Sequence, residues 1–143
     1  MEKILISACL VGDKVRYDGK GQYHPLIKDL LEKYELVPFC PEVEGGLKIP
    51  RIPSEIVKDK VISKTGKDVT SNFISGAKKA LMLCQYLNIK IAILKEGSPS
   101  CGVNEIHNGK FDGKMVKGKG ITASLLEKNG IAVYSENDIE KLL

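Results

Sequence analysis

The feature that most constrains the fold is an alternation of short apolar runs with segments whose apolar residues recur at helical spacing. The runs of strand length lie at residues 3–7, 36–39, 89–95 and 131–134. A long helix is expected to begin near Thr70, which can cap it, with an apolar stripe that includes Leu87, and another helix is expected over 122–128, ended by Asn129 and Gly130. Alternation of this kind is typical of parallel sheets with helices on both faces. We therefore predict an α/β fold over residues 1–143: a single-domain three-layer sandwich with a mainly parallel, Rossmann-like sheet.

Shorter elements are expected between these. Apolar residues at helical spacing predict a helix over 26–34. Residues 61–69, with Gly66 in the middle, are typical of a small hairpin, and Ser135 can cap a short helix near the C-terminus. The glycine-rich, basic segment 109–120 has neither the Walker nor the GxGxxG spacing of a phosphate-binding loop, so a hairpin turn followed by a helix cap explains most of it.

Composition narrows the class of protein. The chain has 143 residues, of which 43% are hydrophobic and 28% charged, and these values are ordinary for a globular domain. A net charge of +4 suits an anionic ligand but is too weak to argue for DNA binding. No run approaches the ~20 apolar residues of a membrane helix, and residues 4–11 lack the apolar core of a signal peptide. We expect a cytoplasmic protein that binds neither membranes nor DNA.

Three of the four cysteines follow predicted strands. Cys9, Cys40 and Cys101 each come a few residues at most after a strand, and parallel strands deliver their carboxyl ends to one edge of a sheet. Cytosolic cysteines more often bind metal or react than form structural disulfides. Thiolates select zinc, copper(I) or an iron–sulfur cluster, and three ligands leave one coordination position open. The alternative is that each thiol is a small buried hydrophobic group, since no CxxC pair is present.

Cys84 is different in kind. It lies on the apolar stripe of the long predicted helix, which also contains Phe73, Ile74, Leu81 and Leu87. A packed thiol is the ordinary state of a cysteine at such a position. We therefore expect Cys84 in the core and outside any functional site.

Two charged residues near the second cysteine are candidates for chemistry. Glu42 follows Cys40 in a backbone stiffened by Pro41, so its carboxylate can serve as a proton carrier beside a bound cation. Arg51 lies between two prolines, which limits its backbone freedom, and its guanidinium can clamp a planar or anionic group. The alternatives are a solvated loop glutamate and a surface salt bridge.

Hydroxyl and aromatic groups accompany the other two cysteines. Ser98 and Ser100 precede Cys101 and can hydrogen-bond its sulfur or pass protons. Neither serine lies in the GxSxG turn of a nucleophile. Arg16 and Tyr17 offer a cation and an aromatic face, which suit a nucleobase or an anion, although a surface turn with a half-buried tyrosine explains them equally well.

Taken together, these segments resemble the thiouracil desulfidase family over essentially the whole chain, and the cysteine-bearing motifs are specific to it. The length resembles the stand-alone form of that family. The motifs are Ser7-Ala-Cys-Leu-x-Gly12, Arg16-Tyr-Asp-Gly19, Cys40-Pro-Glu42, Gly45-Gly-Leu47, Pro50-Arg-x-Pro53, Ser98-Pro-Ser-Cys-Gly102 and Gly118-x-Gly-Ile-Thr122.

The resemblance implies a [4Fe-4S] cluster held by Cys9, Cys40 and Cys101, with its fourth iron open to the sulfur of a thiolated nucleobase. It implies non-redox conversion of thiouracil to uracil plus sulfide, for which the sulfide acceptor is unknown. Glu42 and Ser98 match the proton-handling pair of the family. The candidate substrate-binding residues are Arg16, Tyr17, Arg51 and Ser100.

Two other functions stay open from the sequence. One is an iron–sulfur or zinc-bearing module that binds or senses sulfur without turnover. The other is a desulfidase that acts on thiouridine nucleotides or on tRNA. A net charge of +4 provides little electrostatic attraction for the phosphates of tRNA.

Overall fold

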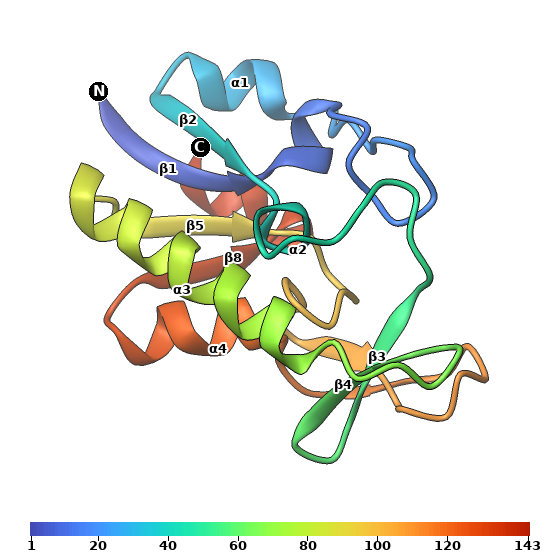
Figure 1. Cartoon of the computed structure of the whole chain (residues 1–143). Helices are drawn as coiled ribbons and strands as arrows, with labels where there is room; N and C mark the ends of the chain where they lie inside the picture. The colour runs from blue at the N-terminus through green and yellow to red at the C-terminus, as the bar shows by residue number, and fades with distance from the viewer.

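The computed structural model describes residues 1–143 and contains a four-stranded parallel sheet in the order β2-β1-β5-β8 (Figure 1). Its strands are β1 (Glu2–Ser7), β2 (Tyr34–Phe39), β5 (Ile91–Leu94) and β8 (Ala132–Ser135). All four predicted strands are confirmed, with boundaries that shift by at most two residues. β2 and β5 lie on opposite sides of β1, so the connection that leaves β1 toward β2 and the one that leaves β5 toward β8 diverge at the carboxyl edge of the sheet.

Two helices cover one face of the sheet. These are α3 (Thr70–Leu87) and α4 (Ile121–Lys128), and both expected helices are confirmed. Leu5 of β1 belongs to one apolar cluster with Cys84 of α3 and Leu126 of α4. Cys84 is 1% exposed and has only apolar neighbours in this cluster, as expected for a core residue.

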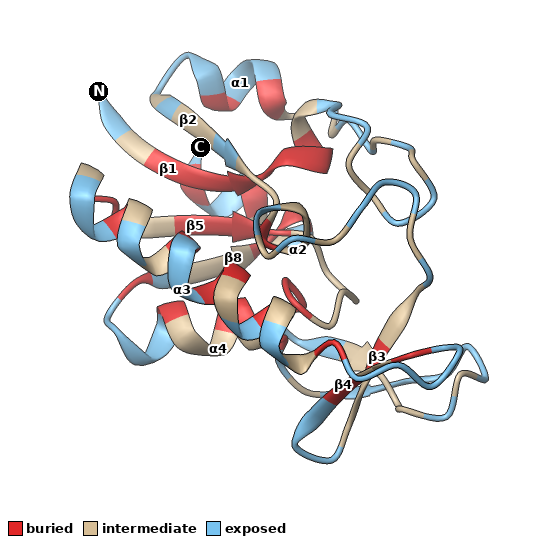
Figure 2. Ribbon diagram, viewed as in Figure 1, coloured by how far each residue is buried: buried red, intermediate tan, exposed pale blue.

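The opposite face is covered by α1 (Ile27–Leu31) and by the 3-10 helix η2 (Glu136–Leu142), which follows β8. Ile4 and Ile6 alternate with Leu5 along β1 and pack against Leu30 and Ile139 on this side. The buried residues of Figure 2 therefore concentrate on the two central strands, β1 and β5. The three-layer sandwich is confirmed. None of the helices is long and apolar enough to span a membrane.

Two antiparallel hairpins form a small lobe beside the sheet (Figure 1). One joins β3 (Ser54–Val57) to β4 (Lys60–Ser63), and the other joins β6 (Glu105–His107) to β7 (Met115–Lys117). The second confirms that the segment 109–120 contains a hairpin turn followed by a helix start.

Three local expectations need correction. The hairpin expected over 61–69 has its main ladder earlier, between β3 and β4, and three backbone hydrogen bonds and one isolated bridge continue it around Gly66. The helix expected over 26–34 ends at Leu31, because Tyr34 pairs with Glu2 as the first residue of β2. Ile74 is 41% exposed, because it lies beside the buried face of α3, which is formed by Phe73, Gly76, Ala77, Ala80 and Cys84.

Candidate active site

All three cysteines that follow strands line one pocket at the carboxyl edge of the sheet. Cys9 lies in the 3-10 helix η1 (Ala8–Val11) after β1, Cys40 precedes the short helix α2 (Pro41–Glu44) after β2, and Cys101 lies in the loop after β5. The cavity measures about 450 Å³. The structure therefore brings together three thiols that lie up to 92 positions apart in the sequence by placing three neighbouring strands side by side.

The thiols are free and mostly buried. Burial raises the pKa of Cys9 to about 11, and it also raises the pKa of Cys40 and of Cys101. Negative charge on Cys40 raises the pKa of Cys9 and of Cys101 further, so the sulfurs are close enough to repel one another as thiolates. The three thiols are therefore neutral in the metal-free chain, and binding of a metal centre must release their protons.

The donor set, three thiols around one cavity, fits an iron–sulfur cluster. No group of three or more His, Cys, Asp and Glu side chains is arranged to hold one metal ion. A cluster instead takes one cysteine per iron, so its ligands stand around a cavity and do not converge on one point. Three thiols that line a cavity of about 450 Å³ meet that requirement.

Glu42 is held in place from two sides. Its Oε1 pairs with Nε of Arg51 at 3.1 Å, and its Oε2 accepts a hydrogen bond from Oγ of Ser98 at 3.2 Å. The side chains of Arg51 and Glu42 are only 8% and 18% exposed, so solvent screens this ion pair little. Both oxygens of the carboxylate are thereby fixed at the pocket wall.

Ser98 connects this carboxylate to the cysteine loop. Its Oγ accepts hydrogen bonds from the backbone N–H groups of Ser100 and Cys101, each at 3.0 Å. A hydroxyl that accepts from two donors and lies near a carboxylate directs its own proton to that carboxylate. Glu42 and Ser98 therefore form one proton-carrying pair, and the same hydroxyl fixes the backbone of Cys101.

Close packing of α2 on α3 places Cys40 and Glu42. A Cβ atom added to Gly76 of α3 would lie 1.9 Å from the carbonyl oxygen of Pro41. Only a residue without a side chain allows α2 to approach so closely. Gly45, at the end of α2, has the same role, since its Cβ would lie 2.1 Å from the carbonyl oxygen of Asn72.

The other predicted binding residues differ in whether they line the pocket and in whether their polar groups are already bonded. Arg16 and Tyr17 lie in the pocket wall, with Tyr17 43% exposed and Nη1 of Arg16 bonded to Gln22 at 2.9 Å. Arg51 also lines the pocket, but its guanidinium is occupied by Glu42 and two backbone carbonyls. Ser100 is a correction: it is fully buried, outside the pocket wall, and its Oγ lies 2.8 Å from Oγ1 of Thr122.

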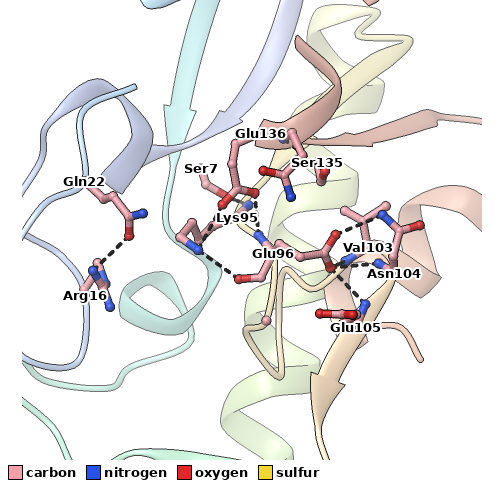
Figure 3. A network of polar contacts seen from close by, with 12 residues as sticks. Ser7, Arg16, Gln22, Lys95, Glu96, Val103, Asn104, Glu105, Ser135 and Glu136 are labelled. Carbon is pink, nitrogen blue, oxygen red and sulfur yellow. Dashed lines mark hydrogen bonds and ion pairs between the residues drawn. The ribbon is translucent and has the colours of Figure 1, made fainter. Parts of the chain in front are cut away.

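Sequence reasoning did not identify an acid that organises the cysteine loop. The carboxylate of Glu96 accepts hydrogen bonds from the backbone N–H groups of Val103, Asn104 and Glu105 and from the amide of Asn104 (Figure 3). Burial alone would raise the pKa of Glu96, but these hydrogen bonds outweigh it and hold the pKa below its ordinary value. A glutamate two residues after an apolar strand and directly before a glycine was the only available signal.

The small lobe contributes two further pocket residues that no sequence spacing indicated. His107 of β6 and Met115 of β7 line the cavity opposite the sheet. Nδ1 of His107 lies 3.2 Å from the carbonyl oxygen of Gly97, which ties the lobe to the loop after β5. The pocket thus lies between the sheet edge and the lobe.

Comparison with known proteins agrees with this geometry. The sequence model of the family described as 2-thiouracil desulfurase matches residues 4–138. YbbK, an uncharacterized protein of Bacillus subtilis (strain 168), is 39% identical over 150 residues, which cover 98% of this chain and 99% of YbbK. The solved structure described as the [4Fe-4S]-dependent thiouracil desulfidase TudS is 45% identical, with a TM-score of 0.94, over 99% of this chain and 95% of that one.

Proposed function

The chain belongs to the 2-thiouracil desulfurase family, and we propose that it hydrolyses the carbon–sulfur bond of thiouracil with a [4Fe-4S] cluster held by Cys9, Cys40 and Cys101. One observation carries the proposal: the three thiols line the same pocket as the Glu42–Ser98 pair. The similarity to a solved [4Fe-4S]-dependent thiouracil desulfidase supports both the reaction and the cofactor.

The thiols supply a ligand set of one residue type. Cys9, Cys40 and Cys101 would lose their protons on binding the cluster, and three ligands would leave one iron without a protein ligand. When bound, the cluster supplies a soft Lewis acid in the cavity, which suits the sulfur atom of a thiocarbonyl group. The buried walls around the thiols exclude bulk water from that position.

Glu42 and Ser98 handle the protons. Water adds to the ring carbon that bears sulfur, and Glu42 takes the proton that the water releases, directly or through Ser98. The carbon–sulfur bond then breaks, so the carbon keeps the oxygen as a carbonyl group. The sum is thiouracil plus water giving uracil plus hydrogen sulfide, and no atom changes its oxidation state.

The pocket wall also offers groups for the nucleobase ring. Tyr17 presents an exposed aromatic face at the pocket, and Arg16 adds a cation beside it. Arg51 acts through Glu42, because its guanidinium is already occupied and orients the carboxylate. We therefore assign ring binding to Tyr17 and Arg16, and a positioning role to Arg51.

Product analysis tests the proposed function. The chain is reconstituted with iron and sulfide under anaerobic conditions and incubated with 2-thiouracil or 4-thiouracil. We expect uracil and sulfide to form in equal amounts over many turnovers. Stoichiometric binding of the thiolated base without uracil would contradict the proposal and favour the sulfur-binding module.

A further inference from the structure

Lys95 is a charged group in the pocket wall that the proposed function does not use. It directly follows β5, and its backbone N–H donates to Oγ of Ser7 at 2.9 Å. Its side chain is 23% exposed, so its ammonium group is partly desolvated, unlike that of an ordinary surface lysine.

The ammonium group of Lys95 is fixed by its surroundings (Figure 3). Nζ pairs with Oε2 of Glu136 at 2.9 Å and donates to the carbonyl oxygen of Glu96 at 3.1 Å. The other carboxylate oxygen of Glu136 accepts from the backbone N–H of Glu96 at 2.7 Å. Glu136 begins η2 and its side chain is 10% exposed, so the far end of the chain holds Lys95 in the site.

This ammonium group has donor capacity left. A lysine offers three N–H donors and no acceptor. The ion pair and the hydrogen bond engage at most two of them, and no other protein group accepts from Nζ. An ammonium group in a pocket wall with a free donor favours an anion as its ligand.

The charges around the three thiols are unevenly distributed. Lys95 bonds through its backbone to Ser7, which lies two residues before Cys9, and its ammonium group lines the pocket. Glu42, in contrast, follows Cys40 by two residues and is hydrogen-bonded to Ser98 in the loop of Cys101. The pocket wall therefore has the ammonium group of Lys95 on the side of the β1 end and the proton-accepting carboxylate on the side of Cys40.

We propose that Lys95, held by Glu136, binds the hydrosulfide anion that desulfuration releases. The inference rests on the proposed function for the origin of this anion. One of the two protons from water goes to the Glu42 side, and the sulfur leaves with the other as hydrosulfide beside the ammonium group. Lys95 then stabilises the leaving sulfur and holds it away from the carboxylate until it departs.

The test is anaerobic calorimetric titration of the cluster-loaded protein with sodium hydrosulfide, with bound iron measured for every variant. Lys95→Met should weaken binding at least about tenfold, since charge-assisted hydrogen bonds contribute that much. Lys95→Arg should restore most of the affinity. Lys119→Met is the matched control and should bind as the unmodified chain does, because it removes the exposed Lys119–Glu127 pair of 2.8 Å outside this pocket.

A second variant keeps the proposal testable if Lys95→Met fails to load iron. Glu136→Gln keeps an oxygen for the N–H of Glu96 but removes the carboxylate that holds Nζ of Lys95. It should bind hydrosulfide more weakly than the unmodified chain, and unchanged or tighter binding with iron retained would overturn the proposal. Unchanged affinity in an iron-loaded Lys95→Met would overturn it too.

The two proposals fail separately. Binding of hydrosulfide through Lys95 in a protein that forms no uracil from thiouracil would overturn the proposed function and leave the anion site. Uracil formation together with hydrosulfide binding that does not depend on Lys95 would overturn the anion site and leave the function.

Discussion

At the scale of single residues, hydrogen bonds and an ion pair fix the orientation of the polar side chains of the site. Glu42 has Arg51 on one oxygen and Ser98 on the other, while Ser98 accepts from two backbone N–H groups of the cysteine loop. Such a carboxylate keeps one orientation before substrate arrives, so no reorganisation is needed during proton transfer. The carboxylate of Glu42 is therefore the group whose change should affect the rate most.

Glu42→Gln should lower the rate of uracil formation by about a hundredfold or more, because general-base catalysis typically contributes that much. Bound iron should stay unchanged, since Gln keeps an oxygen toward Arg51. The measurement is turnover per cluster under anaerobic conditions. Glu44→Gln is the matched control on the same helix, because Glu44 is exposed and has no side-chain partner. Equal rates in the two variants would remove Glu42 from the mechanism.

At the scale of elements, the close contact of α2 with α3 positions Cys40. Alanine normally stabilises a helix interior relative to glycine by ~1 kcal/mol. At Gly76 we expect alanine to destabilise the protein instead, since the added Cβ would lie 1.9 Å from the carbonyl oxygen of Pro41.

Gly76→Ala should therefore lower the free energy of unfolding by about 1–3 kcal/mol, a usual result of overpacking. It should also reduce iron binding, because α2 must move and carries the backbone next to Cys40. Chemical denaturation and iron analysis measure the two effects. Lys78→Ala, at an exposed position of the same helix, should change the unfolding free energy by less than about 0.5 kcal/mol. A stabilised Gly76→Ala would show that the two helices are not in this contact.

The loop after β5 depends on the carboxylate of Glu96. Because the pKa of Glu96 lies below its ordinary value of 4.5, the folded state favours the ionised form. This contribution to stability is complete above about pH 4.5 and is lost as pH falls through the lowered pKa.

Glu96→Gln should reduce the unfolding free energy at pH 7 by about 1–2 kcal/mol, because the hydrogen bonds to the carboxylate lose their charge. Between pH 5 and 3 its stability should fall less steeply than that of the unmodified chain. Denaturant titrations across this range measure both effects. Glu105→Gln is the control, since its side chain is exposed at the start of β6, directly after this loop. Parallel curves for the unmodified chain and Glu96→Gln would contradict the assigned role.

At the scale of the whole molecule, periodicity and strand order explain what could be predicted from the sequence. The four strands, α3 and α4 follow from local apolar patterns, and parallel pairing then brings Cys9, Cys40 and Cys101 to one edge. Contacts between side chains that lie far apart in the sequence leave no such pattern in the sequence. The hydroxyl of Ser100 bonds to Thr122, and Lys95 is fixed by Glu136 at the far end of the chain, so neither placement could be predicted.

The central claim is that three cysteines, and not the fourth, hold the centre that acts on thiouracil. The most direct measurement compares bound iron and uracil formation in anaerobically reconstituted Cys9→Ser, Cys40→Ser, Cys101→Ser and Cys84→Ser. The account predicts that the first three variants lose both, while Cys84→Ser, changed only in the α3 core, keeps both per folded chain. Retention of iron and turnover by any of the first three, or their loss from folded Cys84→Ser, would contradict it.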